Sequence, residues 1–305
     1  MALQRIKNFF LRNEAKNLYT FPTIDISDIG EWSDLLKQIH IRKLDGVIVT
    51  NVFSQEEVRI MNEGILDIPN EQRTPILGGD AFPRIFAQVV TQSFENDDSR
   101  QAYLKRYFEQ GTDINNGYRA LIGVDIKARL ENLFKQISGG RAIKIPIGQN
   151  NQGEYANATV RRYFPEKGFI SVHSGNYFQV EFERFYAHLK EQVNVMNQLS
   201  YFVTVNKAER GGELTLFDLE WDEAQGKKDR LEDRFVDRLD GTKADVQRKG
   251  SVKRQYINPP EGSVLMFAGG EIWHRIEPVK GKKTRITIGG FMGFSHDDKD
   301  VFYWS

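Results

Sequence analysis

The sequence predicts an α+β fold in which a helical layer supports a core of antiparallel strands. Before about residue 140, apolar residues recur with helical spacing; after it, short strand-like runs alternate with Gly, Pro and Asn. Repeated short strands with turns between them are typical of an antiparallel sandwich or barrel. For 305 residues we expect one domain, with residues 1–140 as mainly helical support and 141–305 as the β core.

The N-terminal part is expected to be helical apart from one buried strand. Ser54 and Glu57 form a capping-box pattern at the start of a helix, and Gly139-Gly140 is a stop signal for another. In chain order we predict an amphipathic helix (1–13), a strand (46–50), a helix (55–67), a loop (78–80) and two helices (98–110 and 117–137).

The β core is expected to contain seven strand-like runs. They are residues 158–164, 169–173, 199–205, 213–219, 263–267, 273–278 and 284–294. A highly charged stretch at 222–254 interrupts them and is interpreted as a solvated, partly helical insertion, with a mobile lid as the alternative.

Composition excludes several classes of function. The chain has no cysteine, which excludes disulfides, iron–sulfur clusters and thiol catalysis. It has 42 basic and 42 acidic residues, a balance that argues against a nucleic-acid or membrane-surface partner. No segment is apolar enough to span a bilayer, and the N-terminal stretch has no signal-peptide pattern, so we expect a cytoplasmic protein.

Two of the five histidines have a distinctive context. His173 follows the run FISVH, His274 lies in a strand-like run after a Pro/Gly turn, and Arg285 follows His274 by eleven residues. This arrangement resembles the Fe(II)/2-oxoglutarate oxygenases. The resemblance implies a double-stranded β-helix (jelly-roll, cupin-like) core. It also implies iron bound by imidazole, and 2-oxoglutarate whose far carboxylate pairs with Arg285. Thr287 could add a hydrogen bond to that carboxylate.

The third ligand of that family is absent from the expected position. The usual motif is His-x-Asp or His-x-Glu, whereas this chain reads His173-Ser174-Gly175, and the first carboxylate after it is Glu181. Replacing a carboxylate by glycine removes one negative charge and opens volume beside the metal. A chloride or bromide ion can fill both deficits, which is the pattern of the Fe(II)/2-oxoglutarate halogenases.

Further motifs narrow the resemblance. The chain resembles the stand-alone indole-alkaloid halogenases of hapalindole and welwitindolinone type, most densely over residues 155–305. The motifs are HSGNYF (173–178), QLSYF (198–202), GGEL (211–214), LEW (219–221), TIGGF (287–291) and YWS (303–305).

This narrower resemblance implies a role for each site residue. His173 and His274 correspond to the iron ligands, Gly175 to the halide position, and Ser200 to a serine near the halide that influences catalysis. Ile170 and Phe178 correspond to residues that line the substrate pocket. Members act on freely diffusing small molecules and need no carrier protein.

The sequence thus predicts an Fe(II)/2-oxoglutarate-dependent halogenase. It would consume O₂ and 2-oxoglutarate and place chloride or bromide on an unactivated sp³ carbon of a free, alkaloid-like small molecule. One alternative is a hydroxylase with an atypical ligand set, and it predicts no halide dependence. The other is a non-catalytic β-barrel binding protein, and it predicts no iron-dependent turnover of 2-oxoglutarate.

Overall fold

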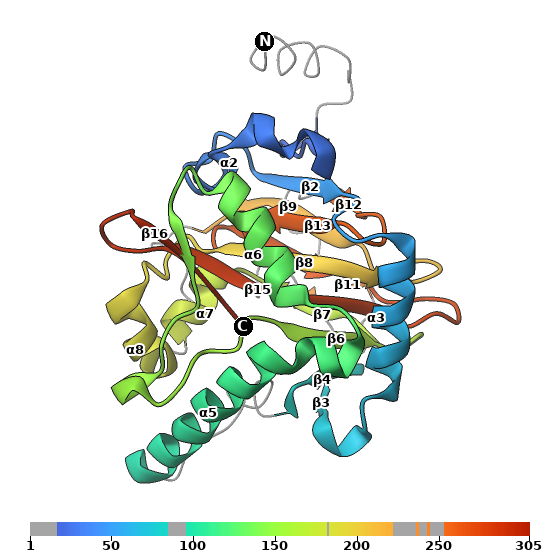
Figure 1. Ribbon diagram of the computed structural model, residues 1–305. Coiled ribbons are helices and arrows are strands. Elements are labelled where there is room, and N and C mark those ends of the chain that lie inside the picture. The colour runs from blue at the N-terminus through green and yellow to red at the C-terminus, as the bar shows by residue number, and fades with distance from the viewer. Residues whose placement is uncertain (1–16, 85–95, 182, 222–235, 238–242, 245–252) are drawn as a thin grey trace.

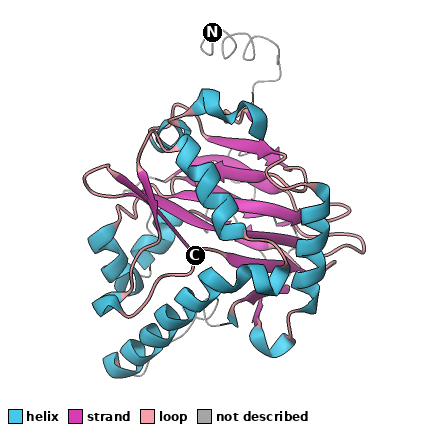
Figure 2. Cartoon of the chain, viewed as in Figure 1, coloured by secondary structure: helices cyan, strands magenta, loops and turns pink. Residues whose placement is uncertain are grey.

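Two β-sheets face each other in the structure, and helices cover the outer side of the larger one (Figure 1, Figure 2). The structure is a computed structural model, and it describes residues 17–84, 96–181, 183–221, 236–237, 243–244 and 253–305. No helix within these ranges is both long and apolar enough to cross a membrane.

The larger sheet combines strands from both ends of the chain. Its order among the described residues is β1-β2-β13-β8-β15-β6-β4-β3, and β16 and β5 extend it from β15. The strands are β1 (Thr23–Asp25), β2 (Gly46–Thr50), β3 (Thr74–Ile76), β4 (Gly79–Phe82), β5 (Ala142–Lys144), β6 (Thr159–Tyr163), β8 (Leu199–Asn206), β13 (Val264–Phe267), β15 (Arg285–Phe294) and β16 (Asp300–Trp304).

The smaller sheet carries both candidate histidines. Its order is β12-β9-β14-β7, and every pairing in it is antiparallel. The strands are β7 (Ile170–His173), β9 (Leu214–Glu220), β12 (Arg254–Ile257) and β14 (Ile272–Ile276). A separate pair joins β10 (Val236–Asp237) to β11 (Lys243–Ala244).

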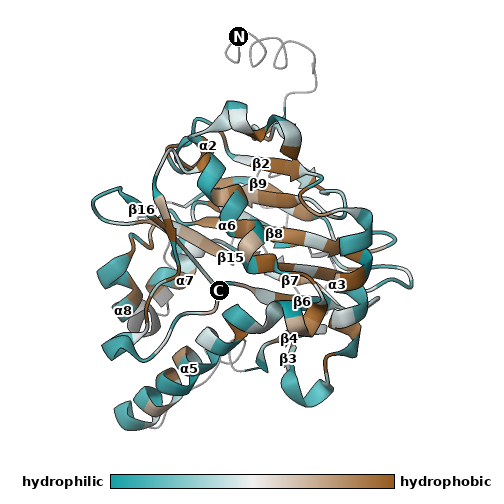
Figure 3. Cartoon of the chain, in the orientation of Figure 1, coloured by the Kyte–Doolittle hydropathy of each residue, from teal (hydrophilic) through white to brown (hydrophobic). Residues whose placement is uncertain are grey.

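Helices pack on the larger sheet through aromatic and aliphatic side chains. Phe134 of α6 (Ile126–Ile137) contacts the rings of Tyr201 and Tyr303, and its ring centroid lies 5.3 and 5.5 Å from theirs. Figure 3 shows hydrophobic residues along β2, β8 and β15 and mostly hydrophilic residues on α5 (Asp97–Ile122). The helices are α2 (Leu35–His40), α3 (Gln55–Asp67), α5 (Asp97–Ile122), α6 (Ile126–Ile137), α7 (Gly175–Glu181) and α8 (Glu183–Gln192), with short 3₁₀ helices at Ile26–Trp32, Asn70–Gln72 and Gln149–Asn151.

Most predicted elements are confirmed, and the N-terminal helices need correction. All seven predicted strands of the core, the strand at 46–50 and the capped helix at 55–67 are present. The predicted helices 98–110 and 117–137 are wrong in their boundaries, because α5 runs unbroken to Ile122 and α6 begins at Ile126. Gly123 adopts a left-handed conformation (φ 74°) that ends α5, and the Asp125 side chain caps α6.

The predicted loop at 78–80 is shorter in the structure, and two predicted segments lie wholly or mostly outside the described residues. The predicted loop at 78–80 is only a turn around Gly78, since Gly79 and Asp80 already belong to β4. The predicted helix at 1–13 lies outside the described residues, as does the insertion at 222–254 except for β10, β11 and residues 253–254.

Candidate functional site

His173 and His274 lie opposite each other on adjacent antiparallel strands. They form a direct cross-strand pair between β7 and β14, and their ring centroids are 4.2 Å apart. Phe267 of β13 meets the His274 ring edge-on at 4.9 Å, so His274 faces the larger sheet. The two imidazoles therefore lie together between the sheets.

Each imidazole is held in the tautomer that binds metal. His173 Nδ1 lies 2.7 Å from the carbonyl oxygen of Ser171, and His274 Nδ1 lies 2.7 Å from that of Ile272. A carbonyl only accepts, so each Nδ1 carries the proton and each Nε2 carries the lone pair. Burial, together with the neighbouring His173, lowers the pKa of His274 well below its usual value. Two oriented imidazoles are donors that Fe(II) accepts.

A bulge in the strand pairing sets the direction of Ile170. Ile170 pairs with Ile276, while His173 pairs with His274. The two pairs are therefore three residues apart on β7 but only two residues apart on β14. Without this irregularity Ile170 and His173 would point to opposite faces. Ile170 is half-buried and packs against the main core cluster on the side of the histidines.

Gly175 begins α7 two residues after the first histidine, and its position is fixed by the turn before β14. Its N–H donates to the carbonyl of Gly269 at 2.8 Å, and the next N–H donates to that of Gly270 at 3.0 Å. Among the described residues, no cluster of three or more His, Cys, Asp or Glu residues could hold a metal. The donor set here is two imidazoles, with glycine where the carboxylate of the oxygenase motif would stand.

Ser200 of β8 lies against the same turn. A Cβ atom added to Gly269 would overlap Ser200 Oγ, and Gly269 also accepts the hydrogen bond from Gly175. The ring centroid of Phe178, in α7, lies 5.4 Å from that of His173. The structure thus brings Ser200, Phe178 and Gly175 to the neighbourhood of the histidine pair.

Arg285 is a buried cation at the start of β15. Its side chain is 6% exposed, and its guanidinium lies 5.4 Å from the centre of the Phe202 ring and 5.9 Å from that of Tyr163. No carboxylate of the described residues lies within ion-pair distance of it. Burial lowers its pKa to about 10, so it remains charged at neutral pH. Such a cation fits an anionic ligand, and its planar guanidinium suits a carboxylate.

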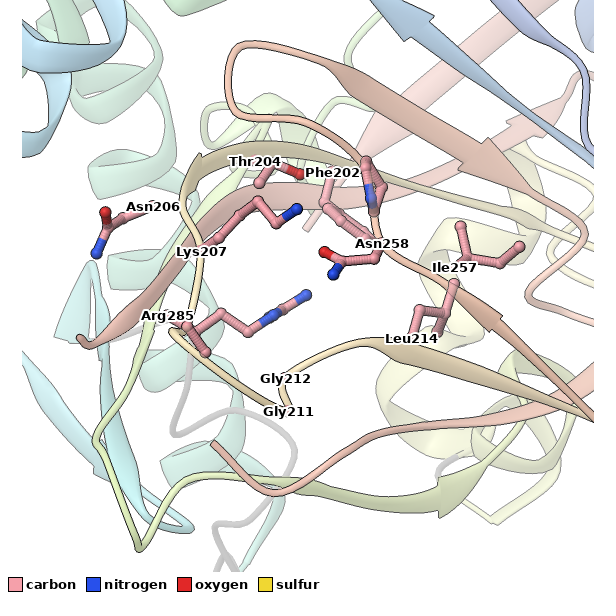
Figure 4. Close-up of a pocket in the computed structure, with 12 residues that line it drawn as sticks. Phe202, Thr204, Asn206, Lys207, Gly211, Gly212, Leu214, Ile257, Asn258 and Arg285 are labelled. Atoms are coloured by element: carbon pink, nitrogen blue, oxygen red, sulfur yellow. The ribbon is translucent and has the colours of Figure 1, made fainter. Parts of the chain in front are cut away.

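The side chain of Arg285 lines a small pocket between the sheets (Figure 4). Thr204 of β8 lines it, and the buried Thr204 Oγ1 has no hydrogen-bond partner among the described residues. Thr287 pairs with Thr204 in register and is buried on the Arg285 side of β15, two residues along. An unpartnered hydroxyl beside a buried cation fits the far carboxylate of 2-oxoglutarate.

The GGEL motif helps to shape this pocket. Gly211 and Gly212 both have positive φ (68° and 72°), and a Cβ added to Gly212 would lie 3.0 Å from Arg285 Cδ. Glycine is therefore needed for the tight turn and for the close approach to Arg285.

Two strands connect the Arg285 pocket to the histidines. On β9, Leu216 pairs with His274, and Leu214, two residues away, lines the pocket. On β8, Ser200 lies at the glycine turn, and Phe202 and Thr204 line the pocket. The histidine pair and the Arg285 pocket therefore lie at two ends of one surface, which β8 and β9 form between the sheets.

Sequence reasoning missed several lining residues. Thr204, Lys207 and Asn258 line the Arg285 pocket, and Figure 4 shows Lys207 and Asn258 directed into it. The alternation of β8 from Ser200 could have indicated Thr204, because positions 200, 202 and 204 share one face. The motifs give no signal for Asn258, which follows a different strand.

Comparison with known structures shows the fold. The chain is similar in structure to an N-substituted L-amino acid dioxygenase from Burkholderia ambifaria, with 18% identity, a TM-score of 0.54, and coverage of 88% of this chain and 89% of that one. A structure of that dioxygenase in complex with α-ketoglutarate gives 19% identity, a TM-score of 0.54, and coverage of 88% and 90%. This likeness shows the fold, an α+β protein with a double-stranded β-helix core.

No curated protein sequence matches the chain. The family model for the carrier-protein-independent halogenase WelO5 matches residues 18–305, which is nearly the whole chain. The chain therefore belongs to the WelO5 family of carrier-protein-independent halogenases, Fe(II)- and 2-oxoglutarate-dependent enzymes that use halide and act on free substrates.

Proposed function

We propose that this enzyme places chloride or bromide on an unactivated sp³ carbon of a free alkaloid-like small molecule. In this proposal His173 and His274 hold the iron, and the halide occupies the space beside Gly175. The observation that carries it is the register-paired histidines with glycine, rather than a carboxylate, at the next ligand position. Two neutral ligands leave a charge deficit at Fe(II) that a monoanion offsets.

The residues of the chain have distinct tasks around the cofactors. When bound, Fe(II), 2-oxoglutarate, O₂ and halide supply the oxidation and the halogen. Ser171 and Ile272 hold the imidazoles in place through their carbonyl oxygens. Arg285 binds the far carboxylate of 2-oxoglutarate and orients the co-substrate along the inner surface, with hydroxyl groups from Thr204 and Thr287 beside it.

The substrate is expected to lie against Ile170 and Phe178. Both are half-buried, and both belong to the segment around the first histidine, so they can contact a molecule beside the metal. Ser200 is proposed to bias the outcome toward halogenation by a hydrogen bond near the halide. The indole-alkaloid class of substrate and the cytoplasmic location stay predictions of the sequence.

One experiment tests the function. Anaerobic enzyme is loaded with Fe(II), 2-oxoglutarate, chloride and a panel of alkaloids, O₂ is then admitted, and succinate and products are measured by mass spectrometry. We expect succinate and a chlorinated alkaloid. A hydroxylated product that is independent of chloride would indicate a hydroxylase, and the absence of iron-dependent succinate would indicate a binding protein.

A matched pair of variants accompanies this experiment. His173→Ala is expected to abolish turnover, because the iron loses one of its two protein ligands. His296→Ala is the control, since His296 is exposed and bonds only the backbone carbonyl of Lys190 among the contacts the structure describes. Equal activity of the two variants would contradict the ligand assignment.

A further inference from the structure

The side chain of Gln198 lies where a side chain at position 175 would begin. Gln198 precedes β8 and is 2% exposed. A Cβ atom added to Gly175 would lie 2.5 Å from Gln198 Nε2 and 3.1 Å from Gln198 Cδ. Contacts this short do not occur between a real Cβ and a nitrogen, so the amide of Gln198 and any side chain at position 175 compete for one space.

Neighbouring groups hold this amide in one orientation. Gln179 of α7, itself 1% exposed, donates from its Nε2 to Gln198 Oε1 at 3.2 Å. The oxygen of Gln198 is thereby engaged by α7, and the NH₂ group is the one nearest Gly175. The backbone is fixed as well, because Gly270 N–H donates to the Gln198 carbonyl at 2.8 Å.

The chemistry of a buried amide NH₂ suits an anion beside the metal. It donates hydrogen bonds without adding a positive charge, so the anion's own charge remains available to balance the iron. Hydrogen bonds to a charged acceptor are about twice as strong as neutral ones, and more so away from water. A carboxylate at position 175 would instead need the volume that the amide occupies.

We propose that Gln198 positions the halide. Its Nε2 group, on an amide held by Gln179, donates to the chloride or bromide ion next to Gly175, and its bulk, together with the Gly270 backbone, requires glycine at position 175. This inference rests on the proposed halogenase site, and it assigns part of the halide binding to a residue outside the proposed iron ligands.

Halide affinity in the absence of turnover tests the proposal. Anaerobic enzyme with Fe(II) and 2-oxoglutarate is titrated with sodium chloride and then with sodium bromide, and the charge-transfer absorption of the complex is followed. Gln198→Leu keeps the volume and removes the donor, so we expect its chloride dissociation constant to rise about tenfold or more. Affinity for 2-oxoglutarate should stay unchanged.

Further variants guard against a purely structural explanation. Gln198→Glu is isosteric and adds a negative charge, so it should abolish the chloride response while the 2-oxoglutarate complex still forms. Gly175→Ala adds only a methyl group, which must displace the flexible end of Gln198, so it should weaken chloride binding as well. Gln136→Leu is the control, on an exposed part of α6.

The outcomes separate this inference from the function on which it rests. An unchanged chloride dissociation constant in both Gln198→Leu and Gln198→Glu, with 2-oxoglutarate bound normally, overturns the role of Gln198 alone. If the absorption spectrum of the wild-type complex changes with neither halide, and the enzyme forms no halogenated product, the proposed function itself is overturned. Weakened chloride binding in the Gln198 variants, but not in Gln136→Leu, supports the proposal.

Discussion

Arg285 is a charged group buried between the sheets, without an ion-pair partner among the described residues. Burying a cation costs free energy unless an anion accompanies it. Burial lowers the pKa of Arg285 to about 10, so this cost is present at every pH below that value and is relieved only as the pH rises through it. Because the buried charge of Arg285 destabilises the ligand-free protein, we expect Arg285 to contribute to the binding of an anionic ligand.

Replacing Arg285 should separate stability from function. In Arg285→Met the buried charge is removed, so the ligand-free protein should be as stable as the wild type or more stable. The KM for 2-oxoglutarate should rise at least about tenfold, because a charged hydrogen-bonded pair is lost. Thermal denaturation and succinate formation measure the two effects. A less stable variant with unchanged KM would show that Arg285 is structural.

Ser200 offers a second test at the scale of one residue. Its hydroxyl lies against Gly269, which is hydrogen-bonded to Gly175. If a hydrogen bond from Ser200 favours halogenation, Ser200→Ala should raise the ratio of hydroxylated to halogenated product by about fivefold, as expected for about 1 kcal/mol. Product analysis by mass spectrometry gives the ratio, and an unchanged ratio contradicts the role.

Local signals in the sequence are sufficient to predict where some helices begin. Helix α3 begins at a reciprocal capping box, in which Glu57 N–H donates to Ser54 Oγ at 3.2 Å and Ser54 N–H donates to Glu57 Oε2 at 2.8 Å. The sequence predicts this helix because all the groups that start it are adjacent in the chain. Elements of this kind depend little on the rest of the fold.

The cap of α3 makes a stability prediction. Ser54→Ala removes the acceptor for an N–H group at the helix start and should lower the free energy of unfolding by about 1 kcal/mol. Ser54→Thr keeps the acceptor and should change it much less. Chemical denaturation measures both, and equal stability of the two variants would contradict a role of the cap.

Other elements depend on contacts that the sequence does not reveal. Gly111 lies within α5, although glycine often ends a helix. It is required there because a Cβ would overlap the carbonyl of Glu154. The sequence does not predict α7 and α8, because both are short and they follow a motif interpreted for its chemistry. The residues of a helix predict that it forms, but contacts with distant parts of the chain determine whether it continues past a residue such as Gly111.

The main buried cluster of the described residues combines N-terminal and C-terminal segments of the chain. A single buried cluster contains residues from helix α6, from the larger sheet and from the smaller sheet, for example Leu130, Val203 and Leu216. This supports the expectation of a single domain, which stays a prediction. His173, His274 and Arg285 could be proposed as site residues from the sequence, because their spacing is a family pattern. Gln198 could not, because only the folded structure brings its side chain to Gly175.

Ligand binding should stabilise the whole molecule. Because Fe(II) and 2-oxoglutarate bind the folded state, their addition under anaerobic conditions should raise the midpoint of thermal unfolding by a few degrees, by about RT ln(1 + [L]/Kd) in free energy. Excess chelator should reverse the part of this shift that depends on metal. Retention of the full metal-dependent shift in His173→Ala would contradict the proposed metal site.

The most direct test of the central claim is to locate the halide. A crystal of the anaerobic complex with Fe(II), 2-oxoglutarate and bromide is measured at the bromine absorption edge. We expect one bromine-specific anomalous peak, absent below the edge, next to the iron, beside Gly175 and near Gln198 Nε2, and no such peak in Gly175→Asp. A water molecule or a protein carboxylate at that position in the wild type, with bromide absent, would contradict it.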